Sequence, residues 1–113
     1  MSIHNYLNDV PFAITICDDK GIVLEMNEKS ALTFSKDGGK ALIGKSLLDC
    51  HSEKSKTMIL EMMQSENVNI YTIEKNGQKK LIYQCPWYVD GKMSGLVELS
   101  IVLPETIPHF VRG

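Results

Sequence analysis

Histidine, cysteine and acidic side chains are the groups in this chain that could carry out catalysis or hold a metal ion. His51 and Glu53 match the first half of a zinc-deaminase signature, in which the histidine binds zinc and the glutamate transfers protons. The second half, Pro-Cys-x-x-Cys, is missing, since Cys85-Pro86 has the reverse order and no partner cysteine. The pair therefore does not predict a metal site.

The adjacent acids Asp18 and Asp19 are the other candidates for acid-base chemistry. Neighbouring residues in a turn point apart, whereas general acid-base catalysis needs groups that converge on one substrate. The sequence has neither a glycine-rich phosphate loop nor a Gly-x-Ser-x-Gly motif. We therefore predict that the chain is not an enzyme and assign no catalytic residue.

The cysteines Cys17, Cys50 and Cys85 are odd in number, lie far apart and form no Cys-x-x-Cys pair. Free cysteine commonly behaves as a small buried hydrophobe, so we expect reduced thiols. The first residues contain no basic region followed by an apolar run and thus no secretion signal. A cytoplasmic location is expected.

Length and composition predict one globular domain that binds neither nucleic acid nor membrane. The 113 residues, 43% hydrophobic and 23% charged, suit a single modest core. The net charge is −2 and the lysines are interleaved with acids, so no basic patch would neutralise a phosphate backbone. The longest apolar stretches fall short of the roughly 20 residues that a membrane helix needs.

The elements that must position any site are an early hairpin, several short helices, one longer helix and three closing strands. Strands are predicted near residues 12–17, 22–26, 68–74, 79–89 and 95–103, with turns at 18–21, 76–77 and 90–91. Asn27 predicts an N-cap for a brief helix over 28–34, and residues 40–50 suit one or two helical turns. The main helix is predicted near 52–66, where Met58, Ile59, Met62 and Met63 form an apolar stripe.

This order of elements resembles the PAS fold, an α+β fold in which helices cover one face of a five-stranded antiparallel sheet. The resemblance rests on Asp-Asp-Lys-Gly at 18–21 with Ile-Val-Leu-Glu-Met-Asn at 22–27, Ile-Gly-Lys-Ser-Leu-Leu at 43–48, and the hairpin around 89–98. Cys-His-Ser-Glu-Lys-Ser at 50–55 is similar to a stretch in one subset of bacterial PAS domains. We expect an N-terminal segment at 1–10, a PAS domain at 11–103 and a tail at 104–113.

The resemblance implies a sensory module that encloses a small molecule or pairs with another protein. It also implies an effector, such as a kinase or regulator, which we expect either in a separate protein or in a segment that has been removed. His51 is the candidate axial ligand should haem bind, although in haem-binding PAS sensors the histidine lies within the long helix, and residues 52–66 contain none. The alternative is a partly exposed histidine beside a helix start. Flavin photochemistry is not expected, since residues 46–49 lack the Asn-Cys-Arg-Phe-Leu-Gln motif of flavin photoreceptors.

We predict a pocket between the inner sheet face and the helical cover. Its predicted lining is Ile14, Ile16, Tyr83 and Leu99 from the sheet and Leu32, Ile43, Leu47, Met58 and Met62 from the cover. This mostly apolar set favours a small apolar or aromatic ligand over a charged metabolite.

The predicted function is therefore a cytosolic signal-sensing domain that binds a small molecule, a partner protein or both. The alternative is a structural homodimerisation module with a filled core and no ligand. A homodimer is expected in either case, either through the outer sheet face, where Tyr83, Trp87 and Tyr88 supply aromatic area, or through the two terminal segments.

Overall fold

One antiparallel sheet of five strands, in the order β2-β1-β5-β4-β3, forms the centre of the computed structural model, which describes residues 5–47 and 53–113. The strands are β1 (Ala13–Asp18), β2 (Val23–Met26), β3 (Asn69–Lys75), β4 (Gln78–Val89) and β5 (Lys92–Val102). The predicted fold class and all five strands are confirmed.

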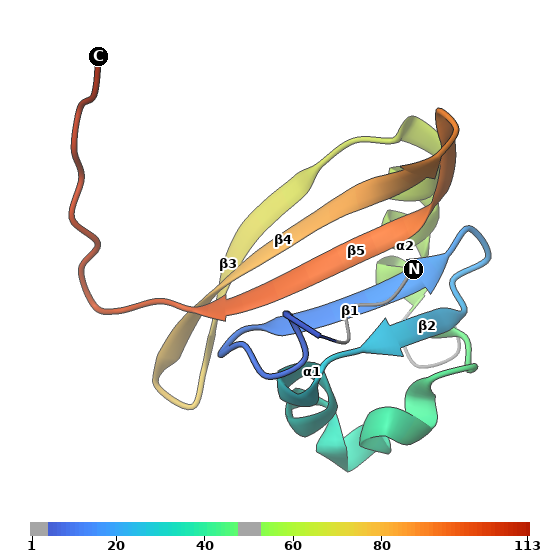
Figure 1. Ribbon diagram of the computed structural model, residues 1–113, viewed down its shortest axis with the longest axis horizontal. Helices are drawn as coiled ribbons and strands as arrows, with labels where there is room; N and C mark the ends of the chain where they lie inside the picture. Colours follow the sequence, from blue (N-terminus) through green and yellow to red (C-terminus); the bar gives the residue numbers. More distant parts are fainter. Residues whose placement is uncertain (1–4, 48–52) are drawn as a thin grey trace.

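Along the described part of the chain, three short helices and one longer helix follow the hairpin of β1 and β2 and precede the remaining three strands. They are α1 (Glu28–Thr33), the 3-10 helices η1 (Ser35–Asp37) and η2 (Gly39–Leu42), and α2 (Glu53–Ser65). Figure 1 shows α2 behind the sheet and α1 beside β2. Within the described ranges, no helix is long and apolar enough to cross a membrane.

The turn of the first hairpin is organised by an aspartate carboxylate. Oδ1 of Asp18 accepts hydrogen bonds from the backbone amides of Lys20 and Ile22, both at 2.9 Å. Gly21 follows with a φ of 83°, a left-handed conformation that glycine adopts without a steric penalty. Asp18 therefore has a structural role in the turn, which agrees with its interpretation as a turn former.

The two later hairpins close through the predicted two-residue turns. Asn76 and Gly77 have φ values of 53° and 76°, and Asp90 and Gly91 have 49° and 79°, as a type I′ turn requires. Because the second of these turns is so tight, Val89 pairs directly with Lys92. Strand β5 therefore begins three residues before the predicted start at 95.

Pro86 lies in β4, whose neighbours are β5 and β3. The pairing of β4 with β3 ends at Gln84, so β4 is an edge strand at Pro86 on that side. A register shift follows between Trp87 and Tyr88. The missing N–H of proline is thus accommodated at a local edge beside a bulge.

The sheet has two faces, and strand register assigns each residue to one of them because directly paired residues share a face. Side chains of the inner face, which lies toward the helices, include Thr15, Cys17, Gln84, Leu96 and Glu98. Side chains of the outer face include Ile14, Ile16, Tyr83, Val97 and Leu99.

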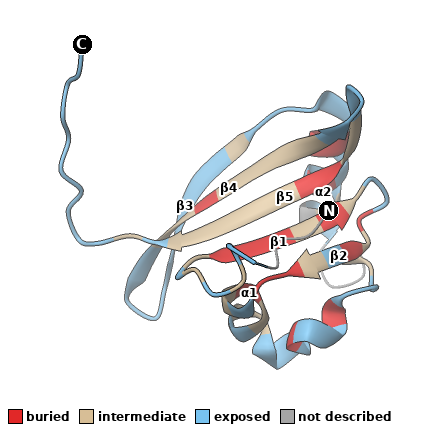
Figure 2. Cartoon of the chain, viewed as in Figure 1, coloured by how far each residue is buried: buried red, intermediate tan, exposed pale blue. Residues whose placement is uncertain are grey.

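The core has two connected parts between the inner face and the helices (Figure 2). In the first, Ile59, Met62 and Met63 of α2 pack on Cys17 and Leu96 of the sheet. The second consists of Val23, Met26 and Leu42, with Phe34 and Leu47 packed against them. The apolar stripe of the longest helix therefore faces the sheet as predicted, although Met58 is half exposed.

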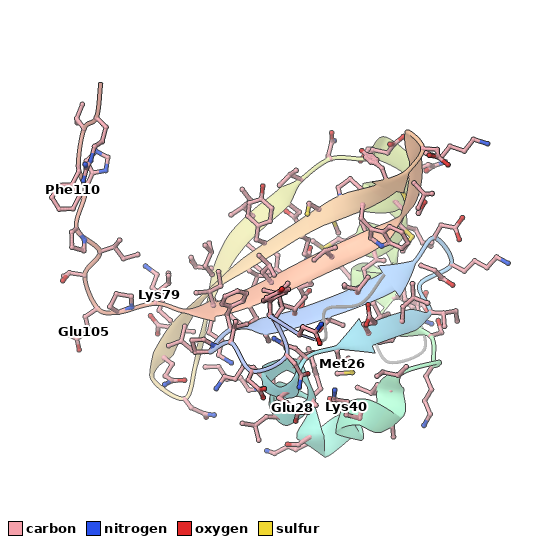
Figure 3. All side chains as sticks on the ribbon, viewed as in Figure 1. Met26, Glu28, Lys40, Lys79, Glu105 and Phe110 are labelled. Carbon is pink, nitrogen blue, oxygen red and sulfur yellow. The ribbon has the colours of Figure 1, made fainter. Side chains whose placement is uncertain are left out.

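Residues 103–113 follow β5 without helix or strand. In Figure 1 this segment extends away from the sheet, and Figure 3 shows Phe110 far from the rest of the chain. The Phe110 side chain is 67% exposed. The segment contributes nothing to the core described above.

Candidate functional site

A cavity of about 260 Å³ lies between the inner face of the sheet and the helices. Most of its wall is apolar and, apart from Met58, comes from both core parts: Val23, Met26, Phe34, Leu42, Leu47, Met58, Ile59, Met62 and Leu96. Asp37, Lys45 and Ser46 also border it, and the first two are exposed. The cavity, which is partly open to solvent at this polar border, therefore suits a molecule with an apolar body.

Three of the residues predicted to line a pocket do line this cavity, namely Leu47, Met58 and Met62. The four predicted sheet residues, Ile14, Ile16, Tyr83 and Leu99, do not; they lie on the outer face. The reason is that both faces of this sheet carry apolar side chains, so alternation along a strand does not reveal which face meets the helices. The cavity-bordering residues Thr15, Cys17, Gln84 and Glu98 are one position out of phase with those predicted.

The two remaining predicted residues, Leu32 and Ile43, are exposed and lie outside the cavity wall, with Leu32 at 66% exposure. Helix α1 directs Ser30 toward the sheet instead, and the Ser30 hydroxyl lies 2.6 Å from the Thr15 hydroxyl. Leu42, the last residue of η2, is buried in place of its neighbour Ile43. These short helices have too few turns for their apolar period to identify a buried face.

A row of polar side chains crosses the inner face of the sheet, and sequence reasoning missed it. Register places Asn69, Gln84, Glu98 and Thr15 opposite one another across β3, β4, β5 and β1. Nδ2 of Asn69 donates to Oε1 of Gln84 at 3.1 Å, and Nε2 of Gln84 donates to Oε2 of Glu98 at 2.6 Å. This series of hydrogen bonds ends on the carboxyl group of Glu98, which borders the cavity.

Burial keeps the two other titratable side chains near Glu98 in their neutral forms. Desolvation raises the pKa of the Cys17 thiol, and the charges of Asp18 and Glu98 raise it further, whereas a backbone hydrogen bond at Leu96 lowers it. Burial also raises the pKa of the Tyr71 hydroxyl, and Glu98 adds to that effect while a hydrogen bond with Gln84 opposes it. Cys17 is therefore a poor nucleophile at neutral pH, as expected for a core thiol.

The candidate haem ligand His51, together with Cys50, lies outside the described residues. Among the described residues the sole histidine is His109, in the exposed segment after β5. No described side chain bordering the cavity is therefore a histidine.

No family model matches this chain, and no curated protein matches it in sequence. Solved structures do match its fold. The PAS domain of histidine kinase ThkA is 15% identical, with 79% of this chain and 96% of that chain covered, and a TM-score of 0.65. The PAS domain of Bordetella pertussis BvgS is 19% identical, with 87% and 81% covered and a TM-score of 0.61.

A third match is the Aer2 receptor of Vibrio cholerae, which is described as a dual PAS-haem oxygen sensor. It is 11% identical, with 82% of this chain and 95% of that chain covered, and a TM-score of 0.60. These matches agree with the strand order and the position of the helices described above. The chain therefore has the PAS fold.

Proposed function

We propose that this chain is a cytosolic sensory module that binds a small organic molecule in the cavity between the sheet and α2. The cavity itself is the observation that carries the proposal. At about 260 Å³ it lies just below the roughly 300–1,000 Å³ of pockets for drug-sized ligands, and its wall is mostly apolar. The PAS fold, which the matched sensor proteins share, supports a signalling role rather than an enzymatic one.

A ligand in this position would act on the contact between α2 and the sheet. Met62 belongs both to the cavity wall and to the core part that joins α2 to Cys17 and Leu96. A molecule that presses on Met62 therefore changes how α2 packs. A signal results only if the ligand binds two arrangements of the helix with different affinity, and a separate effector protein would then read the difference.

Filling the cavity from the helix side tests this proposal. Met62→Trp should weaken binding of any cavity ligand by at least about tenfold, because the indole occupies the space that the ligand needs. The measurement is protein-observed NMR with a library of small aromatic and aliphatic molecules. Leu60→Trp is the matched control, since Leu60 is half exposed on α2 and does not border the cavity.

Unchanged binding in a folded Met62→Trp protein would place the ligand elsewhere, and a library from which nothing binds the unmodified chain would refute the proposed function. Melting temperatures of both variants establish that each is folded.

The outer face of the sheet supports a second candidate function, homodimerisation. Apart from the buried Ile14, its apolar side chains are half-buried in the single chain: Ile16, Leu81, Tyr83, Cys85, Trp87, Val97, Leu99 and Ile101. Tyr83 and Trp87 share this face because the register shift in β4 comes after both. Figure 1 shows no helix in front of it within the described part of the chain. Partly exposed apolar area of this kind is a common feature of protein interfaces.

Sedimentation velocity at several protein concentrations tests the dimer and its location. Tyr83→Glu should weaken self-association by roughly tenfold or more, because it introduces a charge into an apolar contact. Phe110→Glu is the comparison, since it changes the exposed terminal segment instead. A mass of one chain at every concentration would remove the dimer, and an effect of Phe110→Glu alone would assign the contact to that segment.

A further inference from the structure

One acidic side chain, Glu98, borders the cavity from the sheet side and forms no ion pair with any described residue. Its Oε2 accepts a hydrogen bond from the neutral amide of Gln84, and no described residue donates to its Oε1. Neither of the ion pairs seen between described residues, Lys40 with Glu28 and Lys56 with Glu53, involves Glu98. Glu98 is thus a carboxyl group in a mostly apolar cavity, and among the described residues only one of its two oxygens accepts a hydrogen bond.

The surrounding hydrogen bonds fix what this polar wall presents to a ligand. Gln84 receives a hydrogen bond on its carbonyl from Asn69, so its amide nitrogen is directed at Glu98. The Thr15 hydroxyl is paired with the Ser30 hydroxyl. Within the row, the strongest group left to meet a ligand is therefore an acceptor with negative charge.

A carboxylate that is partly removed from water is stabilised most by a positively charged donor, because charge-assisted hydrogen bonds are about twice as strong as neutral ones. Lys45 does not supply that charge, since it has no ion pair with Glu98 and its side chain lies at the exposed border of the cavity. The missing partner can come from the ligand.

We propose that the cavity binds a small organic amine, whose ammonium group pairs with Glu98 and whose apolar body lies against Met26, Met58, Met62 and Phe34. This inference rests on the proposed function and names its ligand class. Flexible methionine side chains suit an apolar body of variable shape, and the ring of Tyr71 on the same wall attracts a cation. A ligand carboxylate in this position would be repelled by Glu98.

The charge on the ligand distinguishes this proposal from the uncharged ligand that the sequence favoured. The test uses three probes with the same phenyl body, phenethylamine, phenethyl alcohol and phenylacetate, and measures their affinity for the full 113-residue chain by titration calorimetry or NMR. Phenethylamine should bind roughly tenfold tighter than the alcohol, and phenylacetate should bind most weakly.

Glu98→Gln should remove the preference for the amine while leaving affinity for the alcohol unchanged, because the substitution keeps the shape and removes the charge. Glu74→Gln is the matched control, since Glu74 is exposed on β3 and does not border the cavity. It should leave the tenfold preference intact. The comparison of the three probes in the unmodified chain does not depend on whether the variant folds.

Equal affinity for amine and alcohol, or tighter binding of phenylacetate, would overturn the amine while leaving a ligand-binding cavity in place. The same holds if none of the three probes binds but other molecules bind in a way that Met62→Trp blocks. If no molecule binds at all, the proposed function fails together with this inference.

Discussion

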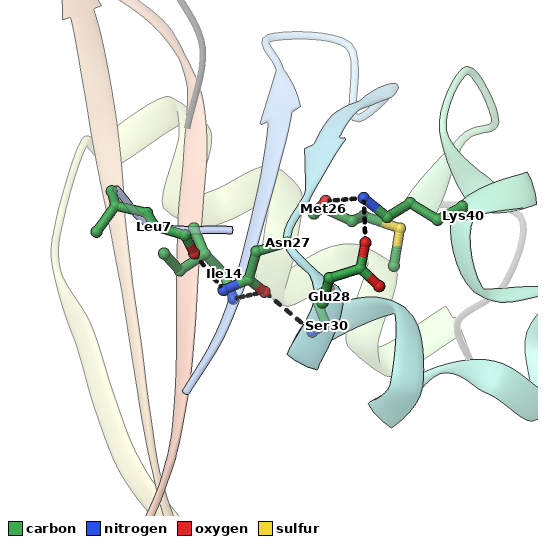
Figure 4. Close-up of polar contacts among 7 residues, drawn as sticks. All are labelled: Leu7, Ile14, Met26, Asn27, Glu28, Ser30 and Lys40. Carbon is green, nitrogen blue, oxygen red and sulfur yellow. Dashed lines mark hydrogen bonds and ion pairs between the residues drawn. The ribbon is translucent and has the colours of Figure 1, made fainter. Parts of the chain in front are cut away.

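Replacing Asn27 with alanine is expected to lower the free energy of unfolding by about 3–5 kcal/mol, through loss of a helix cap and of buried hydrogen bonds. The side chain is 0% exposed. Its Oδ1 accepts hydrogen bonds from the amides of Ile14 at 2.9 Å and Ser30 at 3.0 Å (Figure 4). Its Nδ2 donates to the carbonyls of Leu7 at 3.0 Å and Phe12 at 2.9 Å.

The size of the effect follows from what the alanine variant leaves behind. Asn27 ties together the N-terminal segment, strand β1 and helix α1, and truncation leaves polar backbone groups of all three without their partner. Domains of this size have a total stability of only about 5–15 kcal/mol, so the loss would bring the protein close to its unfolding threshold. Chemical denaturation monitored by circular dichroism measures it.

Glu28→Ala is the control for Asn27→Ala, because it changes the next residue without touching the buried network. Glu28 is exposed and pairs with Lys40 at 3.6 Å, a surface ion pair worth about 0–1 kcal/mol (Figure 4). Lys40 keeps its hydrogen bond to the Met26 carbonyl at 2.9 Å. If Asn27→Ala lowers the free energy of unfolding no more than Glu28→Ala does, the buried hydrogen bonds of Asn27 do not stabilise the fold.

The sequence predicted those parts of the fold that depend on local chemistry. Asn27 was predicted as an N-cap because its position before a short helix is sufficient evidence. The turns at 76–77 and 90–91 followed from Asn-Gly and Asp-Gly, since few other residues adopt two successive left-handed conformations. The further bonds of Asn27 to Leu7, Phe12 and Ile14 were not predictable, because they depend on how a distant part of the chain crosses the sheet.

The site was predicted less well than the fold, and the reason lies in strand register. Both Met58 and Met62 border the cavity, and the helical period of α2 indicated the buried position of Met62, whereas Met58 is half exposed. Gln84 and Glu98 were not predicted as site residues, since nothing local indicates that they are paired on the neighbouring strands β4 and β5. A polar row of this kind becomes visible only when the pairing of all the strands is known.

Gly95→Ala is expected to lower the free energy of unfolding by about 4 kcal/mol, through overpacking and loss of a buried hydrogen bond. A Cβ atom at this position would overlap the carbonyl oxygen of Cys17 and lie 2.6 Å from Nε1 of Trp87. These two atoms are themselves joined by a hydrogen bond of 2.9 Å, in which the indole N–H donates. The methyl group would therefore force apart β1, β5 and the indole ring at one point.

Two further variants separate the steric effect from other causes. Gly91→Ala changes a glycine with a φ of 79° and open space around it, so only backbone strain of about 1–2 kcal/mol should result. Trp87→Phe removes the indole donor and should cost about 1 kcal/mol on its own.

The double variant Gly95→Ala/Trp87→Phe should remain nearly as unstable as Gly95→Ala, because the clash with the Cys17 backbone persists after the indole is gone. Trp87 is the only tryptophan, so its fluorescence reports the local change, and a red shift should accompany the loss of stability in Gly95→Ala. Restoration of stability in the double variant would mean that the indole ring, and not the backbone of β1, requires glycine at this position. A Gly95→Ala protein as stable as Gly91→Ala would show that β1 and β5 can separate at Gly95 without loss of the packing between them.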